Sequence, residues 1–147
     1  MLKIIVRTVL AIIGGCVVGF GALMAVEAIR HMFYPVPHDL NFSELAVIQA
    51  HVLNYPLGAF LFVIAGWIFA TFSGGISAAL LAPKRERLVA TIIGAIVLIV
   101  TLVNIIIIPH PFWVSLAGLF GVIVAALLVP QFVTPFRTGG HATFTNL

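Results

Sequence analysis

The sequence has few charged residues and a single cysteine. Of its 147 residues only 7% are charged, seven being Lys or Arg and four Asp or Glu, whereas 63% are hydrophobic. A soluble domain usually carries about 25% charged residues, and an intrinsically disordered chain combines low hydrophobicity with high net charge. The composition therefore excludes both classes and indicates an integral membrane protein.

The same scarcities exclude two kinds of binding. One cysteine, Cys16, allows neither an intramolecular disulfide nor a metal site built from several thiolates. The formal net charge of +3 is too small and too dispersed for a nucleic-acid partner. The lipid bilayer is the partner that the composition predicts.

Four apolar segments are long enough to cross a bilayer as helices, which takes about 20 residues each. They lie at about 8–29, 57–82, 88–108 and 112–129. Prolines stand near their boundaries, where helices begin or end: Pro56, Pro83, Pro109, Pro111 and Pro130. The sequence predicts an all-α fold, a four-helix transmembrane bundle of residues 1–130 followed by a short cytoplasmic tail, 131–147.

A short helix is predicted between the first two spans. Asn41-Phe42-Ser43-Glu44 is typical of an N-cap with Glu three residues later, and Leu45, Ile48 and Val52 follow at helical spacing. We expect an amphipathic helix at about 42–54, lying on the extracytoplasmic surface.

The basic residues predict the orientation, because Lys and Arg beside membrane spans collect on the cytoplasmic side. With an even number of spans, six of the seven fall on one side: Lys3, Arg7, Lys84, Arg85, Arg87 and Arg137. Arg30 alone falls on the other. Both termini are therefore expected in the cytoplasm. The segment ending at Cys16 loosely resembles a lipoprotein cleavage box, but residues 17–26 stay apolar, which favours an uncleaved first span.

Small residues at four-residue spacing predict how the spans pack, because they let membrane helices approach closely. The stripe on the second span is the longest, so this span is expected at the centre; it also offers a surface to a second copy or another membrane protein. The predicted packing residues are Gly15, Gly19, Gly66, Ala70, Gly74, Ala78 and Gly121.

Polar side chains collect at the extracytoplasmic side. Glu27, Arg30 and His31 fall at i, i+3 and i+4 on the first span, and Asn104 precedes the Pro109-His110-Pro111 turn by five residues. His51 lies on the expected surface helix. An ionisable group at membrane depth usually faces the bundle interior and has a partner. We therefore predict one polar cluster formed by Glu27, Arg30, His31, His51, Asn104 and His110.

This cluster admits several interpretations. A structural or accessory role, with Glu27 paired to Arg30, is favoured, and a small proton-linked carrier or channel using Glu27 and His31 is the alternative. A metal- or haem-binding subunit would use Glu27, His31 and His110 as ligands. No Ser or Cys lies beside the histidines in the sequence, so no catalytic residue is assigned, and neither an enzyme activity nor a cofactor is favoured.

The chain also resembles a known kind of protein. Glu27-Ala28-Ile29-Arg30-His31, Tyr34-Pro35-Val36-Pro37, Asn41-Phe42 and Ile108-Pro109-His110-Pro111-Phe112-Trp113 are similar to segments of small four-span bacterial inner-membrane proteins of unassigned activity, an uncharacterised family. The resemblance covers the chain up to Gln131. It implies an inner-membrane location and no mechanism.

Overall fold

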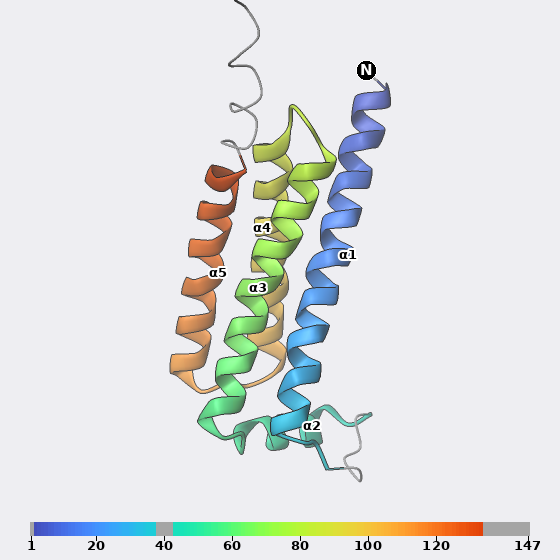
Figure 1. Ribbon diagram of the computed structural model, residues 1–147. Coiled ribbons are helices and arrows are strands. Elements are labelled where there is room, and N and C mark those ends of the chain that lie inside the picture. The colour runs from blue at the N-terminus through green and yellow to red at the C-terminus, as the bar shows by residue number, and fades with distance from the viewer. Residues whose placement is uncertain (1, 38–42, 134–147) are drawn as a thin grey trace, which may run out of the picture.

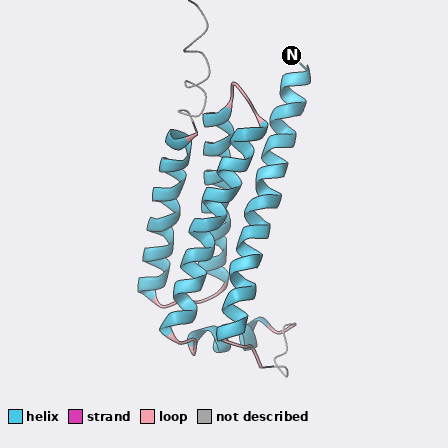
Figure 2. Ribbon diagram, viewed as in Figure 1, coloured by secondary structure: helices cyan, strands magenta, loops and turns pink. Residues whose placement is uncertain are grey.

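The computed structural model describes residues 2–37 and 43–133, and helices account for nearly all of them. The helices are α1 (Leu2–Phe33), α2 (Leu45–Leu53), α3 (Leu57–Leu81), α4 (Glu86–Ile107) and α5 (Phe112–Phe132) (Figure 1). Short loops join them, and the described residues contain no strand (Figure 2). The predicted all-α class is confirmed.

Four of these helices, α1, α3, α4 and α5, are long and apolar enough to cross a membrane, with 32, 25, 22 and 21 residues. At 1.5 Å per residue, 21 residues extend about 31 Å, which matches a hydrocarbon core of about 30 Å. Large apolar side chains such as Leu10, Ile106 and Phe120 are exposed on their outer faces. The fold is that of a multi-pass helical membrane protein.

Two spans are longer than predicted. α1 runs well beyond about 8–29 at both ends, because basic side chains such as Lys3 and Arg7 can reach the headgroup region while the backbone stays helical. α5 continues through Pro130 to Phe132 instead of ending at Val129. Proline in a last turn removes one backbone donor, but helical hydrogen bonding continues beyond it, since the Val133 N–H donates to the Val129 carbonyl at 3.2 Å.

α2 is shorter than the predicted helix at about 42–54. It begins at Leu45, with Glu44 as its N-cap residue and without a side-chain cap; the predicted N-cap, Asn41, lies outside the described residues. The Gln49 amide donates to the carbonyl of Ile107 at the end of α4, at 2.7 Å. α2 and the α4–α5 turn lie at one end of the bundle, the α2 end, and the N-terminus and the α3–α4 turn lie at the other, the N-terminal end (Figure 1).

α3 is the central helix, as predicted. It packs against α1, α4 and α5, whereas α1 packs mainly against α3. A buried cluster at the N-terminal end joins these helices, with Ala78 from α3, Val89 and Ile93 from α4, and Val129 from α5. α3 therefore positions the other three spans.

The α1 and α3 backbones touch at the predicted small residues. A Cβ atom added at Gly15 would lie 2.7 Å from the Gly74 carbonyl oxygen, and one added at Gly19 would lie 2.9 Å from that of Ala70. Both distances are shorter than van der Waals contact, so only glycine fits at these positions. At Gly66 and Gly121 an added Cβ would instead meet side-chain atoms that can move, Leu23 Cδ1 of α1 at 2.9 Å and Ile68 Cδ1 of α3 at 2.5 Å.

This packing changes one expectation. The stripe of Gly66, Ala70, Gly74 and Ala78 is buried, and its neighbours at the glycines include residues of α1. It therefore offers no open surface to a second protein in this structure. The predicted partner surface is used within the chain.

Candidate functional site

A cavity of about 330 Å³ lies at the α2 end of the bundle. Side chains from α1, α2, α3, α4 and the α4–α5 turn line it. Its polar lining consists of Glu27, Arg30, Asn104 and His110, and its aromatic lining consists of Tyr55, Phe60 and Trp67. Four of the six residues of the predicted polar cluster thus meet around one space.

Arg30 is the most buried charged group of this cavity. Its Nε donates to Glu27 Oε2 at 2.8 Å, and its guanidinium carbon lies 5.0 Å from the centre of the Tyr55 ring. A buried charge requires an oppositely charged partner, because its desolvation penalty is larger than the stabilisation that weak contacts provide. The Arg30 side chain is only 5% exposed, yet its Nη1 has no hydrogen-bond partner among the described residues. This nitrogen is buried and is not open to the space of the cavity.

Asn104 supplies a second unused polar group. The sequence predicted Asn104 as a member of the polar cluster, and in the described part of the chain its side-chain amide makes no hydrogen bond. It lines the same cavity as the Glu27–Arg30 pair. A half-buried amide without a protein partner usually bonds to another molecule, and the cavity has room for one beside Asn104.

His110 completes the polar lining from the α4–α5 turn. Its Nδ1 lies 2.7 Å from the Ile108 carbonyl oxygen, so Nδ1 carries the proton and a neutral ring presents Nε2 as an acceptor. The ring stands edge-on to Trp67, with centroids 5.7 Å apart. Burial lowers the pKa of His110 below its usual 6.5, and the bond to Ile108 opposes this in part. The cavity therefore favours the neutral imidazole.

This lowered pKa makes stability depend on pH. Between the pKa of folded His110 and its unfolded value of about 6.5, the unfolded state binds more protons, so the free energy of unfolding rises with pH. We expect the purified protein to lose thermal stability as the pH falls from 7 to 5. In His110→Asn, which keeps an N–H donor toward Ile108, this loss should be smaller.

His31→Asn is the matched control, because the His31 side chain is exposed. Its melting temperature should follow the same pH profile as the wild type. If the melting temperature of His110→Asn depended on pH as that of the wild type does, His110 would have the same pKa in the folded and unfolded states, which would contradict the prediction.

The two remaining histidines of the predicted cluster do not line the cavity. His31 is exposed, and no ion pair joins it to Glu27 within the described residues. The His51 ring packs edge-on against Tyr55, with centroids 5.0 Å apart, and its Nε2 is buried without a described partner. His51 thus supports the cavity wall through Tyr55.

The proposed metal ligands are not brought together. In the part of the chain that the structure describes, no group of three His, Cys, Asp or Glu side chains is arranged to hold a metal ion. Glu27 and His110 line the cavity, but His31 does not. The trio Glu27, His31 and His110 therefore does not form a ligand set.

Sequence reasoning missed the aromatic wall. Phe60 and Trp67 lie seven residues apart, which places them on one face of α3, and both are buried. Val63 lines the cavity between them. Their spacing was a usable signal, but aromatic residues are common in membrane helices, so spacing alone does not separate a cavity wall from a lipid-facing stripe.

The cavity carries polar and charged side chains that can contact a ligand. Its charges balance, one guanidinium against one carboxylate, and no Ser, Thr or Cys is among the described residues that line it. No protein family, curated protein or solved structure matches the chain. Fold and site together define a multi-pass helical membrane protein with a polar cavity at the α2 end.

Proposed function

We propose that the protein is a non-enzymatic accessory protein of a bacterial inner membrane, which holds a small, neutral, lipid-soluble ligand in the cavity at the α2 end. One observation carries this proposal: the side chains of Arg30 and Asn104, the latter without a described hydrogen-bond partner, line a cavity with aromatic walls. Polar side chains below the surface usually have a hydrogen-bond partner, and a bound ligand would supply one to the Asn104 amide. A volume of about 330 Å³ is in the range of small-molecule sites.

The charge balance indicates the ligand class. Arg30 is already paired with Glu27, and burial favours neutral His110, so an anionic ligand would bring an uncompensated charge. A neutral carbonyl oxygen accepts hydrogen bonds from Arg30 and Asn104 without that cost. The Phe60 and Trp67 rings suit a flat or apolar body.

The orientation belongs to the same proposal. Lys3, Arg7, Lys84, Arg85 and Arg87 stand at the N-terminal end of the bundle, and Arg30 is at the α2 end. The bias of basic residues toward the cytoplasm supports an N-terminal end inside the cell and a cavity at the outer side.

The carrier alternative has less support. It needs a polar path that continues from Glu27 through the membrane. Among the described hydroxyls, Thr71 donates to the Trp67 carbonyl at 2.8 Å and Ser73 to that of Phe69 at 2.7 Å, so each is bonded to its own helix. Thr101 is buried without a described partner. These groups do not form a hydrogen-bonded chain.

A short-chain 1,4-benzoquinone is a suitable probe, because it is neutral, flat and lipid-soluble and has two carbonyl acceptors. In a Trp113→Phe background, it should quench Trp67 fluorescence saturably, and Asn104→Leu should weaken binding by about 2- to 10-fold, the equivalent of one neutral hydrogen bond. A C-terminal green fluorescent protein fusion used for expression reports on the orientation, because this reporter matures poorly outside the cytoplasm.

The alkylbenzene of the same shape and Asn54→Leu are the controls. The alkylbenzene should compete weakly, and Asn54→Leu should leave binding unchanged, since Asn54 donates to the Ala50 carbonyl and does not line the cavity. Quenching that rises linearly with the quinone concentration would contradict ligand binding in this cavity. So would quenching that is the same with and without Asn104→Leu. A proton-coupled flux in proteoliposomes that Glu27→Gln abolishes would instead support the carrier.

A further inference from the structure

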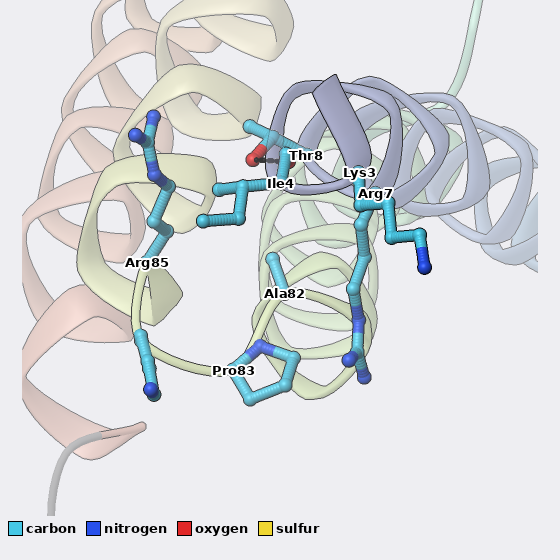
Figure 3. Close-up of a pocket in the computed structure, with 8 residues that line it drawn as sticks. Lys3, Ile4, Arg7, Thr8, Ala82, Pro83 and Arg85 are labelled. Carbon is cyan, nitrogen blue, oxygen red and sulfur yellow. Dashed lines mark hydrogen bonds between the residues drawn. The ribbon is translucent and has the colours of Figure 1, made fainter. Parts of the chain in front are cut away.

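A second cavity, of about 470 Å³, opens at the N-terminal end of the bundle. It is a cleft between the first turns of α1 and the turn that joins α3 to α4, and four cations line it: Lys3, Arg7, Lys84 and Arg85. In Figure 3 Lys3 and Arg7 lie on one side and Arg85 on the other, with Ile4, Ala82 and Pro83 between them. We refer to it as the basic cleft.

Hydrogen bonds fix both sides of the basic cleft. The Arg7 Nε donates at 3.0 Å to the Leu81 carbonyl, one of the carbonyls at the end of α3 that lack a partner within the helix. This bond leaves the terminal guanidinium nitrogens of Arg7 for another acceptor. On the opposite side, the Arg85 N–H donates to the Ala82 carbonyl at 3.0 Å, which closes the turn. The Arg7 side chain and the backbone of the turn are therefore held in place before any ligand binds.

The turn places a lysine where glycine would be easier. Lys84 has a φ of 78°, in the left-handed region that non-glycine residues seldom adopt. Its backbone N–H is held by Glu86 Oε1 at 2.8 Å. The chain thus keeps a cation on the edge of the basic cleft at a backbone position that disfavours a side chain.

The electrostatics favour an anion. No acidic side chain is among the described residues that line the basic cleft, and the adjacent acid, Glu86, is bound to the Lys84 backbone. Arginine donors match the geometry of phosphate oxygens, and lysine adds a point charge. The apolar Ile4 and Pro83 beside these cations suit the glycerol and acyl stem below a headgroup.

The position of the basic cleft selects the source of the phosphate. It lies where two membrane-spanning helices end, so its cations stand at headgroup level. Basic pockets between transmembrane helices bind anionic lipid headgroups. We propose that the basic cleft binds the phosphate headgroup of an anionic phospholipid, as a site separate from the cavity at the α2 end and independent of the function proposed for it.

Native mass spectrometry of the full-length protein in detergent, titrated with phosphatidylglycerol, tests this site. Each cation near a lipid surface adds about fivefold in affinity, so Arg85→Gln should weaken binding about fivefold and Arg7→Gln/Arg85→Gln about 25-fold. Phosphatidylcholine with the same acyl chains should bind more weakly to the wild type and be unaffected by either change. Arg85→Lys should retain most of the affinity.

Arg87→Gln is the charge-matched control, because Arg87 follows Arg85 by two residues and does not line the basic cleft. It should change phosphatidylglycerol binding less than twofold. If Arg87→Gln lost as much phosphatidylglycerol affinity as Arg85→Gln, the lipid would be held by diffuse surface attraction, and the proposal would be overturned. Displacement of the lipid by inorganic phosphate at equal concentration would also overturn it. Lys84→Gln gives a second single variant if Arg85→Gln has a lowered melting temperature, and its full retention of affinity would also contradict the proposal.

Discussion

Gly74→Val should lower the free energy of unfolding by about 3 kcal/mol, the cost of forcing added carbons into a closely packed contact. A Cβ at position 74 would lie 2.7 Å from the Gly15 carbonyl oxygen and 3.2 Å from Ile93 Cγ2. The closer of these atoms is backbone, which cannot rotate away as a side chain does. The α1 and α3 helices would have to separate.

The consequence of that separation is large because α1 has little else to hold it. α1 packs mainly against α3 and only slightly against α4. Cys16, the single cysteine, belongs to α1 and packs against the buried cluster that includes Ala78 and Ile93, next to the Gly15–Gly74 contact. We therefore expect maleimide to label Cys16 faster in the Gly74→Val variant than in the wild type. The variant should also unfold at a lower denaturant concentration in mixed micelles.

Gly21→Val is the matched control. It makes the same substitution in α1, at a position where an added Cβ meets nothing within 4 Å. Its stability should stay within about 0.5 kcal/mol of the wild type, as is usual for exposed positions. Equal stabilities of the two variants would show that the helices are not held by this backbone contact.

Glu27→Ala should have the second large effect, a loss of about 3 kcal/mol in the free energy of unfolding. Removing one partner of a buried ion pair costs about 3–5 kcal/mol, because the other charge stays buried without compensation. The lower end of that range applies because the Glu27 side chain is 26% exposed, whereas that of Arg30 is 5% exposed. Glu27→Gln should lose less, about 1 kcal/mol, since its amide oxygen still accepts from Arg30.

The double variant Glu27→Ala/Arg30→Met separates charge from packing. It removes both charges and keeps an unbranched chain at position 30, so part of the stability lost in Glu27→Ala should return. His31→Ala, at an exposed neighbouring position, should change stability by less than about 0.5 kcal/mol. A double variant less stable than Glu27→Ala would mean that Arg30 contributes by contacts other than this pair.

The small-residue contact was foreseeable from the sequence because its rule is local. Gly15, Gly19, Gly74 and Ala78 recur at four-residue spacing, and such a stripe on one face of a membrane helix has few uses besides close packing. The partner of the stripe was not foreseeable. The sequence left another protein open as its neighbour, and the fold places α1 there.

The polar cluster was foreseeable only in part. Spacing on one helix put Glu27, Arg30 and His31 on one face, but a helical face is wide, and the structure buries Arg30 while it exposes His31. The buried Arg30 guanidinium lies against the ring of Tyr55, which comes from the loop between α2 and α3, 25 residues further along the chain. No local pattern encodes that contact.

By itself, the sequence determined that this is a membrane protein, through its scarcity of charge, and that it has four spans, through the length of its apolar segments. Both depend on composition along the chain, because each helix must satisfy its backbone hydrogen bonds alone and present apolar side chains to lipid. The tertiary structure alone decided which members of the predicted polar cluster share a cavity and which of the basic residues at the N-terminal end line one cleft. Those facts depend on distances between helix ends, which α2 and the α3–α4 turn set through contacts between residues remote in sequence.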